Sequence, residues 1–491
     1  MKKPLLLLWL LLSGCSGSFL EIYPETTLSE GKFYRSETEF ILLVNGCYVP
    51  MQIYEKLEHW VLAELIADNG SFQYNSTTGD VLRLPIDQFI STSNNTVYAT
   101  FWNLSYNGIT RCNKLLAELN QTSVPFSKQS LRERCRGEAL FLRALYYFNL
   151  VRQFGGVPLV IKPLVSQEAV NVKRSTESQV YDQIIADLKA SRMAFGAAAD
   201  VHENGRASEW AALSLLGKVY LTRQNYAEAV AALKPVIESG KYSLLANYAD
   251  LFNPASKDFK ETIFAIQFAE TSQALSNRFI FWFAPWTSAG AITLRPAINM
   301  VNAGWNQPTD DLISAFEAGD KRKDVSVKFW TGRDWDNVVR PIPYCAKYKP
   351  PVAAAADWSS DNLPVLRYAD VLLLYAEALN RQGNTGGATS LVEQVRRRAG
   401  LTTPLTDLTQ ETLNTLIAKE RQVEFCFENQ RWYDLKRTGK ALAVMTAHGA
   451  REKAKKSFLL STSYQITETK LLAPIPAEQI LINRIEQNPG Y

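Results

Sequence analysis

The sequence predicts a mostly α-helical protein in which pairs of antiparallel helices form a scaffold around a long, irregular insertion with short strands. Apolar residues recur at helical spacing along residues 36–51, 54–67, 100–119 and 130–154. Two later segments repeat one pattern of apolar and small residues. The stretch from about 245 to 360 lacks this period and is rich in proline, asparagine and aromatic residues. With 46% hydrophobic and 21% charged residues, the 491-residue chain has the composition of a globular protein.

The chain begins with an expected lipoprotein signal peptide, residues 1–14. Its apolar run, residues 5–12, is far shorter than the roughly 20 residues that cross a bilayer as a helix. The run ends in Leu-Ser-Gly-Cys, which resembles the lipobox of bacterial lipoproteins and implies cleavage before Cys15 with acylation of that residue. Residues 15–35 would then be a polar, lipidated tether. An ordinary signal peptide with an incidental cysteine is the alternative.

The internal repeat is the most informative helical pattern. Its first copy consists of Leu213, Gly217, Tyr220, Ala229, Leu233 and Val236, and its second copy of Leu372, Ala376, Leu379, Ala388, Val392 and Val395. The small residues are spaced as two closely packed antiparallel helices require, and breaks follow at Gln224-Asn225 and Gly383-Asn384. The pattern resembles a tetratricopeptide helix pair. Since the copies are not contiguous, we expect a scaffold with insertions and no regular superhelix.

A strand is expected at 263–268, inside the irregular stretch. Six of the eleven tryptophans also fall in this stretch: Trp282, Trp286, Trp305, Trp330, Trp335 and Trp358. We expect two or three of these six to be exposed. Long irregular segments in a helical protein are commonly functional, and packing of the aromatic residues onto the helices is the other interpretation. By contrast, four tryptophans within helical patterns are expected in the core: Trp60, Trp102, Trp210 and Trp432.

The charge and the metal-binding residue types exclude several functions. The chain has 53 Lys and Arg against 49 Asp and Glu and shows no basic stripe, so no nucleic-acid partner is expected. Its three histidines are not spaced with cysteines as metal ligands, and we predict neither a metal site nor a cofactor. With Cys15 assigned to lipid, five cysteines without close pairs remain, which favours buried free thiols.

Several sequence blocks occur in an order that resembles the SusD/RagB family of outer-membrane nutrient-binding lipoproteins. The blocks are GEALFLRALYYFNLVRQFGGVPLV (137–160), ASEWAALSLLGKVYLTRQNYAEAV (207–230), LPVLRYADVLLLYAEALNRQGN (363–384), KERQVEFCFENQRWYDLKRTG (419–439) and LLAPIPAEQILINRIEQNPGY (471–491). The resemblance extends from residue 15 to 491. It implies a single SusD-like body over 36–491, with tetratricopeptide-like helices at about 36–244 and 361–440 and a ligand-binding insertion at about 245–360.

The resemblance also implies a role. Members of this family capture an oligosaccharide or polysaccharide fragment at the cell surface and deliver it to a SusC-like TonB-dependent outer-membrane barrel. The chain departs from the family pattern at Ala473, within the terminal L-P-I-P stretch, and at Ser16-Gly17-Ser18, which lacks the acidic run resembling a surface-export signal. This second departure leaves open which face of the outer membrane the protein occupies.

The 419–439 block carries three carboxylates on one helix face, Glu420, Glu424 and Glu428, beside Arg421 and Arg431. Glycosidases use two carboxyl groups that flank the sugar bond, whereas one helix face cannot place carboxylates on both sides of a substrate. We therefore expect structural ion pairs, with three partners on the neighbouring scaffold segment: Arg367, Asp370 and Glu377. Arg396, Arg397 and Arg398 are expected to form a solvated face. No catalytic residue is predicted, and we expect no enzymatic activity.

Ligand binding is assigned to aromatic and polar side chains in loops, because sugar rings stack on aromatic faces and their hydroxyls need donors and acceptors. The candidates are Asp68, Asn69, Phe72 and Tyr74 in the stretch 66–75, and Trp282, Trp286 and Trp305 in the insertion. Three alternatives stay open: a peptide-binding member of the same family, a scaffold lipoprotein, and a surface glycoside hydrolase.

Overall fold

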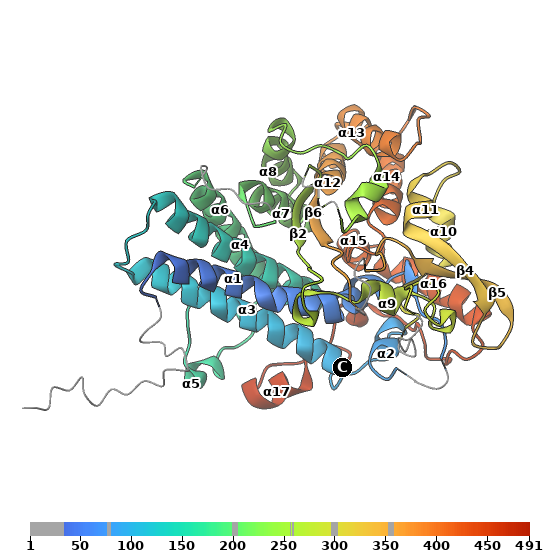
Figure 1. Ribbon diagram of the computed structural model, residues 1–491, viewed down its shortest axis with the longest axis horizontal. Helices are drawn as coiled ribbons and strands as arrows, with labels where there is room; N and C mark the ends of the chain where they lie inside the picture. The colour runs from blue at the N-terminus through green and yellow to red at the C-terminus, as the bar shows by residue number, and fades with distance from the viewer. Residues whose placement is uncertain are drawn as a thin grey trace, which may run out of the picture.

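The computed structural model describes residues 34–75, 80–198, 205–255, 257, 260–295, 303–351 and 358–491. The predicted signal peptide, Cys15 and nearly all of the tether lie outside these residues. Within the described ranges, no helix combines the length and the apolar character needed to cross a bilayer. The described part is mostly helical, and its long helices lie side by side (Figure 1).

Six long helices form the first part of the scaffold, and each packs on the next. They are α1 (Glu37–Tyr54), α3 (Thr96–Gln121), α4 (Gln129–Phe154), α6 (Glu177–Gly196), α7 (Glu209–Thr222) and α8 (Tyr226–Glu238). The helices predicted at 36–51, 100–119 and 130–154 are confirmed with slightly wider bounds. Ser36 begins α1 through a capping box with Glu39. The helix expected at 54–67 is present as two π-helical segments, η3 (Glu55–His59) and η4 (Val61–Leu65).

The predicted repeat is confirmed as two helix pairs, α7/α8 and α12 (Tyr368–Arg381)/α13 (Thr385–Arg398). A Cβ atom at Gly217 would lie 2.4 Å from Cγ of Leu233, so α7 and α8 approach as closely as they do because residue 217 has no side chain. Both turns begin with a residue at positive φ, Gln224 at 60° and Gly383 at 86°. Since α8 also packs on α12, the two pairs are neighbours in space, and the insertion leaves and re-enters the scaffold between them.

Three two-stranded antiparallel sheets occur among the described residues, pairing β1 (Gly70–Ser71) with β3 (Gln307–Pro308), β2 (Thr262–Ile266) with β6 (Leu363–Arg367) and β4 (Val327–Arg333) with β5 (Val339–Cys345). The strand expected at 263–268 is β2, which is buried along its length. Its pairing with β6 closes the base of the insertion, directly before α12. The β1–β3 pair joins the N-terminal stretch 66–75 to the insertion.

Shorter helices cover the remainder of the molecule, and α14 to α16 complete the C-terminal side of the scaffold (Figure 1). The α-helices are α2 (Arg83–Asp87), α5 (Ser166–Ala169), α9 (Phe279–Phe283), α10 (Asp310–Ala315), α11 (Arg322–Ser326), α14 (Gln410–Glu424), α15 (Arg431–Arg437), α16 (Ala441–Lys455) and α17 (Ala477–Asn483). The 3-10 turns are η5 (Tyr248–Phe252), η6 (Gln273–Leu275), η7 (Trp286–Ser288) and η8 (Glu468–Leu471).

The carboxylates of the 419–439 block lie in a buried ionic cluster centred on Glu424. Glu424 pairs with Arg322 (2.9 Å), Arg367 (2.6 Å) and Arg398. Arg367 also pairs with Glu428 (2.7 Å) and Glu261. Although burial acts in the opposite direction, these arginines hold the pKa of the Glu424 carboxyl well below its usual range. Glu424 therefore stays ionised at neutral pH as part of the structure.

The other two predicted partners also form ion pairs. Asp370 accepts a hydrogen bond from Nη1 of Arg421 at 2.8 Å, and Glu377 forms a two-bond pair with Arg437. The structural interpretation of the 419–439 block is thus confirmed for these residues.

The prediction of a solvated arginine face on α13 is wrong for two of the three residues. Arg396 is buried and pairs with Glu317 (2.8 Å) and Glu420 (3.2 Å), and Arg398 reaches Glu261 and Glu424. The face of α13 that carries them lies against carboxylates contributed by the insertion and by α14. The side chain of Arg397 is 61% exposed, as expected.

The tryptophan and cysteine predictions concern the core. Trp60, Trp102 and Trp432 are buried in it as predicted, while Trp210 is half-buried at its edge.

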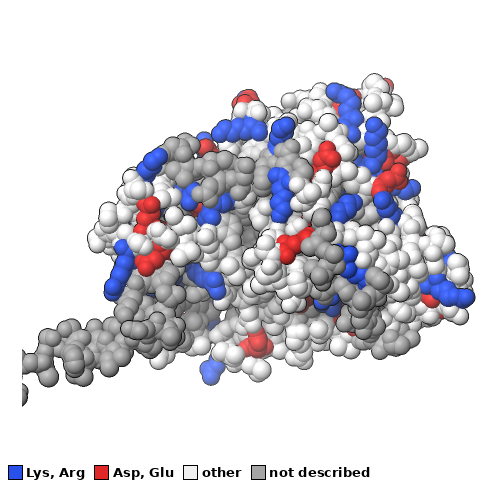
Figure 2. Space-filling view, viewed as in Figure 1, with Lys and Arg blue, Asp and Glu red and all other residues white. Residues whose placement is uncertain are grey.

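The five cysteines in the described part of the chain are buried and free, which confirms that prediction. On the face in Figure 2, Lys and Arg side chains are scattered among acidic and uncharged residues.

Candidate functional site

A pocket of about 440 Å³ lies where the stretch 66–75 meets the insertion. Its aromatic lining consists of Phe72, Tyr74, Trp282 and Trp305, and its polar lining includes Gln73, Asn75, Asp80, Arg83 and Arg278. This volume falls within the roughly 300–1,000 Å³ of small-molecule sites, which combine apolar walls with a few polar groups. We refer to this cavity as the aromatic pocket.

The β1–β3 pairing brings the two halves of the aromatic pocket together. A Cβ atom at Gly70 would lie 2.6 Å from Oδ1 of Asn306 and 3.2 Å from Cα of Leu65, so the absence of a side chain at residue 70 favours this close approach beside the β1–β3 pair. The chain then leaves β1 at Phe72, whose ring centroid is 6.1 Å from that of Trp305. Backbone bonding continues where the N–H of Gln73 donates to the carbonyl of Gly304 at 2.7 Å.

The side chain of Gln73 connects the stretch 66–75 to η7 and to the β4–β5 turn. Its Nε2 donates to Oγ1 of Thr287 and to Oδ1 of Asp334, both at 2.8 Å. Its Oε1 accepts from the backbone N–H of Trp286 at 2.8 Å. A side chain that satisfies its own hydrogen bonds in this way fixes the relative positions of the walls.

Arg83, at the start of α2, places a positive charge against the tryptophans. Its guanidinium carbon lies 5.3 Å from the ring centroid of Trp282, 5.8 Å from that of Trp305 and 5.7 Å from that of Trp60. An ion pair with Asp80 at 2.8 Å holds the head group. The aromatic faces and this cation belong to one wall of the pocket.

An aromatic cluster extends the site from Tyr74 toward the tip of the β4–β5 hairpin. Tyr74 stacks on Phe458 with ring centroids 4.0 Å apart, and Trp335 meets both rings edge-on. Trp335 is 41% exposed, and it is the one exposed residue among the six insertion tryptophans. The expectation of two or three exposed tryptophans is therefore wrong, because most of these rings pack against one another or against the scaffold.

The structure brings four of the seven predicted site residues into one pocket: Phe72, Tyr74, Trp282 and Trp305. Trp286 is half-buried beside it, and its indole N–H donates to the carbonyl of Tyr74 at 3.0 Å.

Asp68 and Asn69 lie buried outside the lining. Asp68 forms a two-bond ion pair with Arg431 at 2.7 and 2.8 Å, and Asn69 donates to Oε1 of Glu64 at 3.1 Å. These contacts give Asp68 and Asn69 the role of holding the base of the 66–75 stretch on α15 and η4.

Sequence reasoning missed Gln73, Arg83 and Phe458. Gln73 lies within the stretch already singled out, and its amide could have been found by asking for donors and acceptors beside the aromatic residues. Nothing in the local sequence distinguishes Arg83 or Phe458, because both reach the site through tertiary packing.

Asp80 is the one carboxylate among the described residues that line the aromatic pocket, and Arg83 holds it. Glycoside hydrolysis in the common mechanisms needs two carboxyl groups facing the bond, so these lining residues do not form an acid–base pair. In the described ranges, no cluster of three or more His, Cys, Asp or Glu residues could hold a metal ion. The arrangement suits ligand binding through stacking and hydrogen bonds.

Comparison with known proteins agrees with this class of fold. The family model described as "Starch-binding associating with outer membrane" matches residues 19–221, and the model described as "SusD family" matches residues 342–491. The chain belongs to the SusD family.

Individual relatives resemble the chain over most of its length. A SusD-like protein of Formosa agariphila is 26% identical, and the alignment covers 96% of each chain. The starch-binding protein SusD of Bacteroides thetaiotaomicron is also 26% identical, over 76% of this chain and 75% of its own. A solved structure, a laminarin-binding SusD-like protein, is 28% identical with a TM-score of 0.76, covering 93% of this chain and all of that one (100%).

Proposed function

We propose that the protein is a lipid-anchored receptor of the outer membrane that captures an oligosaccharide in the aromatic pocket and passes it to a SusC-like TonB-dependent barrel. The observation that carries the proposal is the convergence of Phe72, Tyr74, Trp282 and Trp305 on a cavity with amide and charged side chains. Such walls offer stacking faces for sugar rings and hydrogen-bond partners for hydroxyls. Starch and laminarin, named for two relatives, are both glycans.

In this proposal Trp282 and Trp305 form one stacking surface, and Tyr74 with Phe458 forms a second at the rim. Gln73 positions both surfaces, and Arg83 donates to sugar hydroxyls beside the tryptophans. Asp68 and Asn69 act indirectly, by fixing the base of the loop. The helix array provides the scaffold that would face the barrel.

Calorimetric titration of a glycan panel tests the proposal. We expect a neutral oligosaccharide to bind, and Trp282→Ala or Tyr74→Ala to weaken that binding about tenfold, as the loss of one stacking partner does. Phe329→Ala is the matched control, because Phe329 is exposed on β4 outside the lining and its removal should leave affinity unchanged. Binding of peptides with no glycan bound would contradict glycan capture.

The anchor and the partner are tested separately. Cys15→Ala should release the protein from membranes, and retention of this variant in the membrane fraction would contradict the lipid anchor. Co-purification of the protein with a TonB-dependent barrel from the bacterium that produces it would support delivery of the glycan to that barrel. Glycan binding without any associated barrel would leave capture intact and contradict the delivery step.

A further inference from the structure

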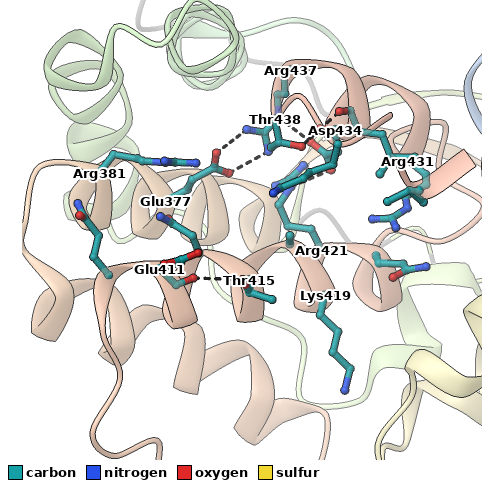
Figure 3. Close-up of a pocket in the computed structure, with 17 residues that line it drawn as sticks. Glu377, Arg381, Glu411, Thr415, Lys419, Arg421, Arg431, Asp434, Arg437 and Thr438 are labelled. Carbon is teal, nitrogen blue, oxygen red and sulfur yellow. Dashed lines mark hydrogen bonds and ion pairs between the residues drawn. The ribbon is translucent and has the colours of Figure 1, made fainter. Parts of the chain in front are cut away.

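A second cavity, of about 610 Å³, lies between α12, α14, α15 and the start of α16, among the helices of the 419–439 block (Figure 3). In contrast to the aromatic pocket, its described lining contains no aromatic side chain. Amides, hydroxyls and charged groups dominate instead. None of its described lining residues is shared with the aromatic pocket.

Two acids in this polar cavity, Glu377 and Asp434, are fully used by arginines, as Figure 3 shows. Arg437 forms two bonds to Glu377 (2.6 and 2.9 Å) and a third to Asp434 (2.8 Å), while Arg421 donates to Asp434 at 2.9 Å. Although burial opposes this, Arg421 and Arg437 hold the pKa of the Asp434 carboxyl well below its usual range. Neither acid offers an open site for a cation.

The arginine that lines this region retains a donor with no acceptor. Nη2 of Arg421 is buried and has no hydrogen-bond partner among the described residues, although Nε and Nη1 of the same side chain are paired. An unmet buried donor costs about 1–3 kcal/mol, and more when the group is charged. An acceptor supplied from the cavity would remove that cost.

Cations also outnumber acids around the cavity. Six described lining residues are Lys or Arg and three are Asp or Glu, and acids outside the lining pair with three of the six cations: Lys419, Arg421 and Arg431. At the rim, Arg381 and Lys440 have no ion-pair partner within the described part of the chain. Glu411, the third acid, lies exposed at the rim on α14.

We propose that this polar cavity is a second binding site, which takes the carboxylate and hydroxyls of an acidic sugar unit such as a hexuronate. The rim cations Arg381 and Lys440 provide charge-assisted hydrogen bonds to the carboxylate, and Arg421, which lies deeper at the other end of α12, adds positive charge to the same cavity. The amides of Gln410 and Asn414 and the hydroxyl of Thr438 serve the ring hydroxyls. A concave site of this size fits a small molecule better than a flat protein partner.

The inference goes beyond glycan capture in the aromatic pocket, and its test separates the two sites. Calorimetric titrations of the purified protein with glucuronate, glucose and inorganic sulfate should show binding of glucuronate, with glucose and sulfate much weaker. The double variant Arg381→Gln/Lys440→Gln should weaken glucuronate binding about tenfold, since exposed, unpaired cations can be replaced without unfolding the helices. Trp282→Ala should leave glucuronate binding unchanged.

A matched control removes the same two charge types elsewhere: Arg397→Gln/Lys453→Gln, both exposed and outside the polar cavity. This variant should bind glucuronate like the unchanged protein. Three results would overturn the proposal: equal binding of glucose or sulfate, equal weakening by both double variants, or loss of glucuronate binding in Trp282→Ala. The last would place the acid in the aromatic pocket.

Discussion

The ionic cluster around Glu424 and the aromatic pocket both concentrate side chains that could bind a ligand. In the cluster these side chains are paired within the protein, whereas in the pocket they line a cavity. In the cluster, the carboxylates of Glu261, Glu424 and Glu428 are buried and each contacts at least one cation of the same chain. In the pocket, aromatic faces and polar groups surround an open volume. The difference teaches that a motif indicates a binding site only where the protein does not supply the partners itself.

The largest expected effect is on the cluster. Arg367→Met removes a cation that three buried carboxylates share, and breaking buried ion pairs on one side costs about 3–5 kcal/mol. Denaturant unfolding should show this loss, while the folded fraction keeps its glycan affinity. Arg397→Met on the same scaffold removes one exposed pair and should change the unfolding free energy by less than about 1 kcal/mol. Loss of affinity at unchanged stability would contradict the comparison.

The packing of the scaffold gives the next effect. Gly217→Ala introduces a Cβ atom 2.4 Å from Cγ of Leu233, and overpacking of this kind costs about 1–3 kcal/mol. Gly386→Ala is the matched control within α13, where nothing lies within 4 Å of the new methyl group. We expect this second change to stabilise the helix by about 0.5–1 kcal/mol. Thermal unfolding of the two variants should show a lower melting temperature for Gly217→Ala and a higher one for Gly386→Ala. Equal shifts would show that α7 and α8 do not touch as described.

In the aromatic pocket, Gln73→Met should weaken glycan binding more than it lowers the free energy of unfolding. The change removes the side-chain bonds to Thr287, Asp334 and Trp286 but keeps the backbone bond to Gly304. With the walls no longer fixed, we expect about tenfold weaker glycan binding and a stability loss of about 1 kcal/mol. Titration beside denaturant unfolding of the same preparation checks this. Unchanged glycan affinity would contradict the role of Gln73 in positioning the walls of the aromatic pocket.

The last effect depends on pH and is absent at pH values below the window. Burial raises the pKa of Glu64 from 4.5 to about 7, against hydrogen bonds from the N–H of Phe427 and from Asn69. Between those pH values the folded protein holds a proton that the unfolded chain has released, so stability falls as pH rises through this window. Glu64→Gln cannot ionise and should gain up to about 3 kcal/mol relative to the unchanged protein across the window, then stay level above it. Parallel unfolding curves from pH 4.5 to 8 test this, and a constant difference would contradict the raised pKa.

Much of the scaffold could be predicted from sequence because helices and their turns are encoded locally. The spacing of Gly217 and Ala229 predicts a close helix pair, and Gln224-Asn225 predicts the turn between its two helices. The arginines of α13 were misjudged for the same local reason: position on a helix does not say what packs on each face. Arg396 and Arg398 meet carboxylates from α14 and from the insertion, far away in sequence.

The site divides in the same way. Phe72, Tyr74, Trp282 and Trp305 could be named from residue type and loop context. Their convergence could not, because it depends on the β1–β3 pairing and on Gln73, which bonds to residues more than 200 positions away. Asp68 and Asn69 have the expected chemistry, but the chain itself supplies Arg431 and Glu64 as their partners.

The sequence by itself determined that the chain is helical, that it contains a repeated helix pair, that an irregular insertion interrupts the scaffold, and which residue types are available for binding. Short-range hydrophobic spacing and turn chemistry suffice for these properties. The contacts between distant segments decide three other properties: α8 packs on α12 across the insertion, Glu420, Glu424 and Glu428 are paired with arginines, and the aromatic pocket and the polar cavity differ in character. These properties depend on contacts between segments that are distant in the chain. A local sequence pattern does not indicate which distant segment packs against it.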